Sequence, residues 1–237
     1  MTKTYKVSLL CLLFASFILT SCEETNILNC AKKWVLYNNQ NLTVNFDGNG
    51  HMFVGASAIS QAVPPSSFQY LDTISGDFEI VIDYEGLFFN SPGLGFQVTL
   101  TANAVNEGNN YMSAMVGTTL VPGLQNGVLH IGAAIDSLGN APSFSNGSYL
   151  QATSTSGQFR LRRIGSTVEV ISGTGTSGNV VTYTKTFFTS PMAFRMTYGS
   201  NYPQTPQYTS SIRFTGFRYY QGTTLTDSDG FDCNSIQ

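Results

Sequence analysis

Hydrophobic and polar residues alternate over short stretches of this chain, and no stretch of useful length has the period of a helix. In the clearest stretch, residues 77–84, apolar side chains occupy every second position: Phe78, Ile80, Ile82 and Tyr84. Successive side chains of a β-strand point to opposite faces of the sheet. The alternation therefore predicts a strand with one face on a core and the other in solvent.

Clusters of Gly, Asn, Ser and Pro separate thirteen segments that we expect to be strands. They span residues 41–46, 51–57, 67–71, 77–84, 95–101, 111–116, 128–135, 149–153, 158–164, 167–172, 180–185, 193–198 and 211–220. Gly165 and Ser166 join two of them as tightly as a primed hairpin turn does. So many strands without helices predict one all-β domain over residues 34–237, a sandwich or a barrel.

The first 21 residues have the pattern of an export signal. Lys3 and Lys6 precede an apolar run over residues 7–19 that only two serines interrupt. At roughly a dozen residues, the run is shorter than the about 20 that a membrane-spanning helix needs. A basic start and a short apolar run are typical of a removable signal peptide.

The end of this run, Leu19-Thr20-Ser21-Cys22, resembles the lipobox of bacterial lipoproteins. The resemblance implies that Cys22 is acylated, as palmitate labelling would detect, and that it anchors the mature chain in a lipid bilayer. An ordinary signal peptide with a chance cysteine is the alternative. Glu23 and Glu24 resemble the surface-export signal of Bacteroidetes lipoproteins, or they form an acidic tether within residues 22–33. We expect a location in the cell envelope, at the outer membrane or cell surface of a diderm bacterium.

The mature chain is acidic. Removal of 21 residues from 237 leaves 216, and the loss of Lys3 and Lys6 leaves 9 basic against 14 acidic residues, a net charge of −5. This balance argues against nucleic acid or an anionic membrane face as a partner.

Cys30 and Cys233 are the cysteines that remain when Cys11 leaves with the signal and Cys22 is lipidated. An oxidising compartment favours a disulfide between them. The bond would close a loop of about 200 residues, which the chain-entropy model values at roughly 5 kcal/mol. Two free thiols are the alternative.

Three segments carry a resemblance to a known superfamily: residues 75–80 begin a strand, residues 159–170 form a hairpin, and residues 212–220 form a closing strand. In this order and spacing they resemble the concanavalin A-like, or laminin G-like, jelly-roll superfamily, over roughly residues 34–222. The resemblance implies two curved antiparallel sheets with nearby termini. It also implies a concave face and rim loops that hold carbohydrate in many members.

Glu79, Asp83 and Glu85 share one face of a predicted strand. Asp83 and Glu85 would lie roughly 6.6 Å apart at the usual rise per residue, and such a carboxylate pair can cleave a glycosidic bond. Laminarinase-type hydrolases of the superfamily carry Glu-x-Asp-x-Glu on one strand, but here Val81 stands in place of the central aspartate. The alternative is a solvent-facing row paired across strands with Arg160, Arg162 or Arg163.

His51 and His130 are the two histidines of the chain, too few for a cage of several histidines around a metal. As a catalytic candidate, His130 could act as a base with a tyrosine acid, as in polysaccharide lyases on similar jelly rolls. The alternative is a packed or surface histidine.

Asp227, Asp229 and Asp232 surround Gly230 near the C-terminus and could hold a structural calcium ion. The segment 45–49, which contains Asp47, is a second oxygen-rich turn. Ordinary turns closed by aspartate side chains are the alternative.

Aromatic rings and amides are abundant, and sugars bind to flat rings and to hydrogen-bonding amides. The candidate ligand-binding residues are Trp34, Asn110, Tyr111, Asn201, Tyr202 and Tyr208. A plain surface loop is the alternative for the last three. We therefore expect a lipid-anchored, non-catalytic module that binds a polysaccharide or other glycan. The alternatives are a glycoside hydrolase or polysaccharide lyase, and a structural or adhesion lipoprotein with an exposed apolar patch.

Overall fold

The computed structural model describes residues 33–39, 41–56, 65–89, 96–105, 110–118, 129–136, 147–152, 154–173, 179–184, 189–200, 209–228 and 231. Within these ranges, no helix is long and apolar enough to cross a membrane. Cys22, Cys30 and Cys233 lie outside the described residues, as does the predicted signal segment. The lipid anchor and the disulfide therefore stay predictions.

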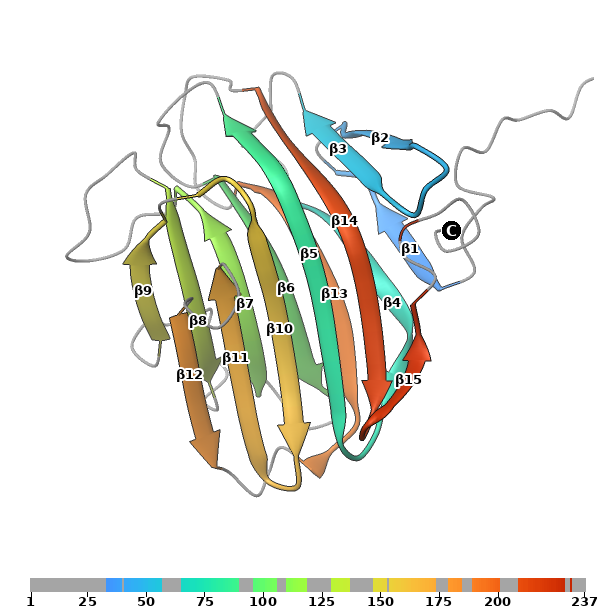
Figure 1. Ribbon diagram of the computed structural model, residues 1–237, viewed down its shortest axis with the longest axis vertical. Helices are drawn as coiled ribbons and strands as arrows, with labels where there is room; N and C mark the ends of the chain where they lie inside the picture. Colours follow the sequence, from blue (N-terminus) through green and yellow to red (C-terminus); the bar gives the residue numbers. More distant parts are fainter. Residues whose placement is uncertain are drawn as a thin grey trace, which may run out of the picture.

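The described strands form two antiparallel sheets (Figure 1). The seven-stranded sheet has the order β1 (Trp34–Tyr37), β4 (Ser66–Ile74), β13 (Met192–Ser200), β6 (Phe96–Ala104), β7 (Tyr111–Gly117), β8 (His130–Asp136) and β9 (Gly147–Gln151). The eight-stranded sheet has the order β12 (Asn179–Thr184), β11 (Thr167–Gly173), β10 (Gly157–Ile164), β5 (Phe78–Phe89), β14 (Ser210–Gln221), β3 (Met52–Ala56) and β2 (Thr43–Phe46), with β15 (Thr224–Asp227) paired to β14. The expected two-sheet antiparallel sandwich is confirmed.

All thirteen predicted strands are present, with shifted ends. The hairpin turn is also confirmed, because Ile164 pairs with Thr167 and Gly165 has a φ of 55°. β1 and β15 were not predicted, since each has four residues, too few for alternation to stand out.

β5 continues five residues beyond its predicted end because a β-bulge accommodates Gly86. Glu85 and Phe88 pair with Arg213 and Ser211, so β5 has one extra residue between these pairs. Gly86 has a φ of 61°, which glycine adopts without steric cost.

The core lies between the two sheets and is built from the inward positions of each strand. On β6, inward Phe96, Val98 and Leu100 are at most 1% exposed. Burial of such side chains stabilises the fold by roughly 1.5–3 kcal/mol each. Because the inward positions are apolar, the outward positions are left for polar chemistry.

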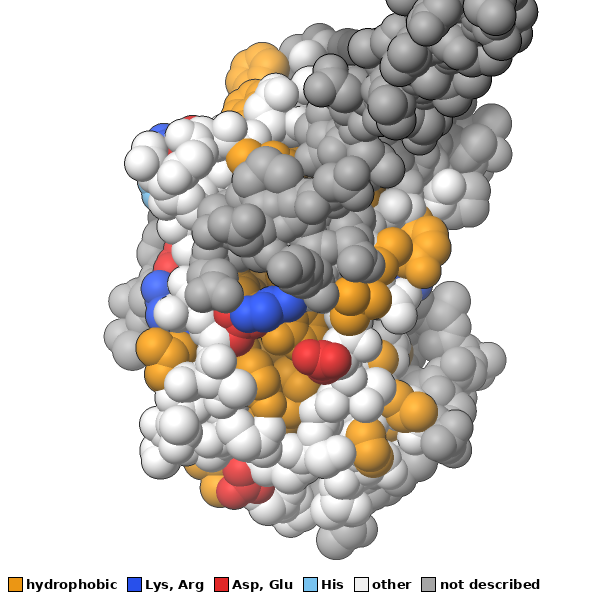
Figure 2. All heavy atoms as spheres, turned by 90° about the vertical axis from the view of Figure 1, so that its right-hand side faces the viewer, with side chains coloured by type: hydrophobic (Ala, Val, Ile, Leu, Met, Phe, Trp, Pro, Cys, Tyr) orange, Lys and Arg blue, Asp and Glu red, His pale blue; other side chains and the backbone are white. Residues whose placement is uncertain are grey.

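The two ends of the described domain meet at one edge of the sandwich, where Lys33 lies 2.9 Å from Asp227. Figure 2 shows this edge, where hydrophobic side chains gather beside charged ones. Leu71 of β4 and Leu225 of β15 are about half exposed, at 47% and 48%. The nearby termini implied by the jelly-roll resemblance are therefore present.

Candidate functional site

The acidic row Glu79, Asp83 and Glu85 lies on the outer face of the eight-stranded sheet, as the alternation predicts. Each carboxylate forms a close ion pair with an arginine on a neighbouring strand. The pairs are Glu79–Arg160 at 2.7 Å, Asp83–Arg218 at 2.7 Å and Glu85–Arg213 at 2.9 Å. Cross-strand pairing was the alternative to catalysis. Of the arginines it named, Arg160 and Arg162 approach Glu79, whereas Arg213 and Arg218 were not predicted.

Arg163 is the exception to the predicted pairing. It points inward from β10, is 1% exposed and lies over the ring of Phe78, 5.0 Å from its centroid. Its guanidinium donates to the carbonyl oxygens of Gly76 and Ser190. Arg163 therefore belongs to the core, because strand alternation places it on the opposite face from Arg160 and Arg162.

His130 lies on the seven-stranded sheet, so it is on the other side of the sandwich from the acidic row. Ile131 on the same strand points into the core, so His130 faces the outer side. Its side chain is 1% exposed, and neither ring nitrogen has a hydrogen-bond partner in the described structure. Burial lowers the pKa of His130. The two catalytic candidates, the carboxylates Glu79, Asp83 and Glu85 and the histidine His130, therefore lie on different sheets.

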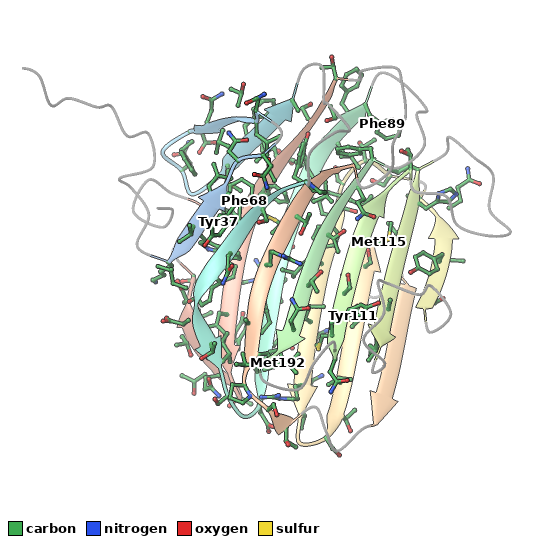
Figure 3. All side chains as sticks on the ribbon, turned by 180° about the vertical axis from the view of Figure 1, so that it is seen from behind. Tyr37, Phe68, Phe89, Tyr111, Met115 and Met192 are labelled. Carbon is green, nitrogen blue, oxygen red and sulfur yellow. The ribbon has the colours of Figure 1, made fainter. Side chains whose placement is uncertain are left out.

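A groove of about 290 Å³ runs over the outer face of the seven-stranded sheet. Its ten lining residues come from β4, β6, β7 and β13 and from the residue before β4: Pro65, Ser67, Gln97, Thr99, Thr101, Asn103, Tyr111, Ser113, Arg195 and Thr197. Figure 3 looks onto this sheet, with Tyr37 on β1 and Tyr111 and Met115 on β7. None of the ten residues is acidic.

Strand register lines up one row of side chains across this sheet. Successive pairs join Tyr37, Ser67, Thr197, Thr99, Met115, Gly132 and Tyr149. Six interstrand spacings of about 4.8 Å make the row roughly 29 Å long. A tyrosine stands at each end; the hydroxyl side chains of Ser67, Thr197 and Thr99 follow Tyr37, and the buried Met115 and Gly132 precede Tyr149.

The two tyrosines are held differently. Tyr37 is 51% exposed, on the edge strand β1. The ring of Tyr149 lies against Gly132, where a Cβ atom would clash with the ring. Glycine at this position lets the ring of Tyr149 lie against the sheet. The row therefore ends in one projecting ring and one ring packed on backbone.

Hydrogen-bonding groups within the groove are available to a ligand. Thr101 Oγ1 lies 3.4 Å from Ser113 Oγ, at the limit of hydrogen bonding. The hydroxyl of Thr99 has no hydrogen-bond partner in the described structure. Arg195 is exposed. The Thr99 hydroxyl is buried beneath this surface, so a ligand in the groove would bind to Arg195 and to the hydroxyls of Thr101 and Ser113, since hydroxyls both donate and accept.

The predicted ligand-binding residues lie in different surroundings. Tyr111 lines the groove, and Asn110 lies directly before it, 9% exposed. Trp34 is 1% exposed and packs against Tyr70, Phe217 and Phe231. Trp34 is therefore a core residue and is not available for stacking on a ligand, which corrects the prediction. Three other candidates, Asn201, Tyr202 and Tyr208, lie outside the described residues.

Most of the groove was missed by sequence reasoning. A signal was present in β6, where Gln97, Thr99, Thr101 and Asn103 alternate with apolar residues. This alternation predicts an outer polar face but not which strands flank it. Arg195 carried the same signal on β13, where it alternates with the apolar Phe194 and Met196, whereas Tyr37 lies on a strand too short to show it.

The predicted calcium ligands do not assemble in the described part of the chain. Asp227 is 6% exposed, and its two carboxylate oxygens bind the Lys33 ammonium and the Tyr70 hydroxyl, which donates at 3.0 Å. Burial, followed by the charge of Asp227, raises the pKa of Tyr70. No group of three metal-binding side chains occurs among the described residues. Asp229 and Asp232 lie outside them, so their part in a calcium site stays a prediction.

The second oxygen-rich turn is an aspartate-closed turn, as the alternative interpretation proposed. The backbone N–H of Asn49 donates to Asp47 Oδ1 at 2.8 Å, and this bond is the main cause that holds the pKa of Asp47 well below its usual range. His51 and Arg213 lie 2.7 and 2.8 Å from Asp47 Oδ2. The carboxylate is thus occupied by protein donors.

Comparisons by sequence find nothing: no protein-family model and no curated protein matches this chain. Solved structures match it by fold. A functionally unknown protein from Saccharomyces cerevisiae has a TM-score of 0.52 at 10% identity, covering 79% of this chain and 96% of its own. The potassium-bound carbohydrate recognition domain of Emp46p has a TM-score of 0.52 at 11% identity, covering 80% and 89%.

A third match is a glycoside hydrolase family protein from Mycobacterium thermorestibile, with a TM-score of 0.50 at 12% identity, covering 79% of this chain and 92% of its own. At such low identity, these likenesses concern the fold and not the activity. They confirm the structural resemblance inferred from the sequence. The chain has the concanavalin A-like jelly-roll fold.

Proposed function

We propose that this protein is a non-catalytic glycan-binding module that holds a polysaccharide across the outer face of its seven-stranded sheet. The observation that carries the proposal is the groove of polar side chains on β4, β6, β7 and β13, which the pairing of Ser67 with Tyr37 continues to an exposed ring at the sheet edge. A polar groove that continues to an exposed ring fits a ligand that presents both hydroxyls and C–H surfaces.

The chemistry of the groove suits sugars. Ser67, Thr101 and Thr197 present hydroxyls, and Gln97 and Asn103 present amides, which can pair with sugar hydroxyls in both directions. The groups stand on paired strands, so little ordering is needed on binding. The rings of Tyr37 and Tyr111 add apolar surface against which a sugar ring can pack.

Binding is favoured over cleavage by the distribution of carboxylates. Hydrolysis of a glycosidic bond by the usual route needs two carboxyl groups flanking that bond. The groove lining contains none, and Glu79, Asp83 and Glu85 are ion-paired on the opposite sheet. The named role of one fold match, the carbohydrate recognition domain of Emp46p, agrees with this proposal but rests on fold alone.

We further propose that the domain is tethered to a membrane outside the cytoplasm through acylated Cys22. The support is the sequence, in which Lys3, Lys6 and the short apolar run precede a lipobox-like segment. Such a tether would present the groove to polysaccharide at the cell envelope.

The test compares two exposed aromatic residues on opposite faces. Tyr37 is 51% exposed and pairs with the groove residue Ser67, whereas Phe53 is 43% exposed on β3 of the other sheet. Tyr37→Ala should weaken retention on glycan arrays and in polysaccharide-containing gels roughly three- to tenfold, the value of one aromatic contact. Phe53→Ala should leave retention unchanged.

Two results would contradict the proposal. One is retention that Phe53→Ala lowers and Tyr37→Ala does not. The other is release of reducing ends or unsaturated products from a polysaccharide panel by the purified wild-type protein. Product release would make the protein a hydrolase or lyase rather than a binding module.

A further inference from the structure

Arg195 stands within the groove without a partner among the described residues. On β13, it pairs in register with Thr101 of β6 and with Gln69 of β4. The side chain is exposed. Its guanidinium has no hydrogen bond, ion pair or ring contact with the residues that the structure describes.

The other five arginines of the chain are all engaged. Four of them form ion pairs on the outer face of the eight-stranded sheet: Arg160, Arg162, Arg213 and Arg218. Arg163 is buried and donates to backbone carbonyls. Arg195, in the proposed binding groove, is the one arginine whose guanidinium has no ion pair or hydrogen bond with a residue that the structure describes.

The charge of the groove differs in sign from that of the whole chain. Nine of its ten lining residues are neutral, so Arg195 gives the lining a charge of +1. The full chain carries a net charge of −3. A guanidinium offers a planar fork of donors that matches a carboxylate or sulfate group. Gln69 and Thr101 flank it and can donate to the same oxygens.

We propose that the glycan is an acidic polysaccharide and that Arg195 binds its carboxylate or sulfate groups. This inference rests on the proposed glycan-binding function and names the substrate class of that groove. A neutral polysaccharide would leave the guanidinium without a charged partner, whereas an anionic one gains a charge-assisted bond at each occupied site.

The experiment uses matched polymers. Polygalacturonate and its carboxyl-reduced derivative differ in charge alone along the same backbone, and heparin with its desulfated form tests sulfate separately. Wild-type protein should bind polygalacturonate roughly tenfold or more tightly than its neutral, carboxyl-reduced derivative, or heparin by a similar factor more tightly than its less charged, desulfated form. Added salt should weaken that binding, because exposed charges are screened.

Two variants locate the effect. Arg195→Gln should lose the preference for the acidic polymer, and Arg195→Lys should retain part of it. The control is Arg218→Gln, which removes an arginine from the opposite face and should not alter binding. Because Arg195 is exposed and unpaired, Arg195→Gln should also keep the wild-type melting temperature, so that loss of binding reports on the groove.

The possible outcomes distinguish a failure of the acidic-glycan inference from a failure of the proposed glycan-binding function. Binding to neutral polymers that Tyr37→Ala weakens and Arg195→Gln does not would overturn the acidic-glycan inference and leave the glycan-binding function standing. Binding to no polysaccharide would overturn both. An acidic preference abolished by Arg218→Gln instead would assign the ligand to the other sheet and overturn the role of Arg195.

Discussion

The ammonium group of Lys33 lies 2.9 Å from the carboxylate of Asp227, so residues nearly 200 positions apart close the sandwich edge where the described domain begins and ends. The side chain of Asp227 is 4% exposed and that of Lys33 is 33% exposed. The Tyr70 hydroxyl donates to the other oxygen of the same carboxylate. The pair thus ties β15 of one sheet to the start of β1 in the other.

Removal of one partner from this pair should destabilise the fold. Lys33→Met should lower the free energy of unfolding by about 2 kcal/mol, because it leaves a nearly buried carboxylate without its cation. Urea denaturation checks this value. Glu169→Gln is the control, since Glu169 lies 3.6 Å from Arg162 at the surface, and it should cost less than about 1 kcal/mol. Equal losses in both variants would contradict a special role for Lys33.

The same closure bears on the predicted disulfide. Cys30 precedes Lys33 by three residues, and Cys233 follows Asp227 by six. At about 3.5 Å per residue, these segments reach roughly 10 and 20 Å, far enough to meet. Peptide mapping without reductant should recover one linked pair joining Cys30 to Cys233. Reduction should then lower stability by up to about 5 kcal/mol. Recovery of two alkylatable thiols from exported protein would refute the pairing.

Arg163 should contribute strongly to stability, although it is a cation in a hydrophobic core. Arg163→Met should lower the free energy of unfolding by about 3 kcal/mol, because the carbonyls of Gly76 and Ser190 lose a charged donor. The matched control is Arg162→Met on the same strand, whose side chain is 37% exposed and should cost under about 1 kcal/mol. If chemical denaturation gives similar losses for both, the buried contacts of Arg163 are energetically unimportant.

His130 should make the fold sensitive to mild acid. Burial lowers its pKa below the ordinary value of 6.5, so the folded ring stays neutral while the unfolded ring takes up a proton. The unfolded state then binds more protons below about pH 6.5, and stability falls as the pH falls toward the folded pKa.

Melting temperatures measured from pH 7.5 to pH 5.5 check this expectation. The wild type should lose stability across the window, and His130→Gln should lose less. His51→Gln is the control, because His51 lies at the surface beside Asp47, and this variant should retain the wild-type loss. If the loss of stability disappears in His51→Gln and persists in His130→Gln, then His51 causes the acid sensitivity and the prediction for His130 is wrong.

The lipid anchor is tested at Cys22. Cys22→Ala should abolish palmitate labelling and release the protein from the membrane fraction, because no thiol remains to be acylated at the lipobox-like segment. Cys11→Ala, within the signal, should leave labelling intact. Labelling that survives in Cys22→Ala would show that the resemblance to a lipobox is misleading.

The strands and the direction of their side chains could be predicted from the sequence, because alternation is a local property. Phe78 and Ile80 face inward and Glu79 faces outward, as the pattern of β5 indicates. The inward position of Arg163 follows from the same rule on β10, since Phe159 and Leu161 are buried beside it in the alternation. Because Arg163 is charged, its residue type alone suggested an outward position.

The candidate site was decided by the tertiary structure. Tyr37, Thr99 and Tyr149 lie on three strands far apart in the sequence, and they share a row only because β1, β6 and β9 belong to one sheet in matching register. Strand order depends on pairings between distant segments, whose local patterns are alike. For the same reason Glu79 and His130, both plausible catalytic residues by type, lie on opposite sides of the sandwich.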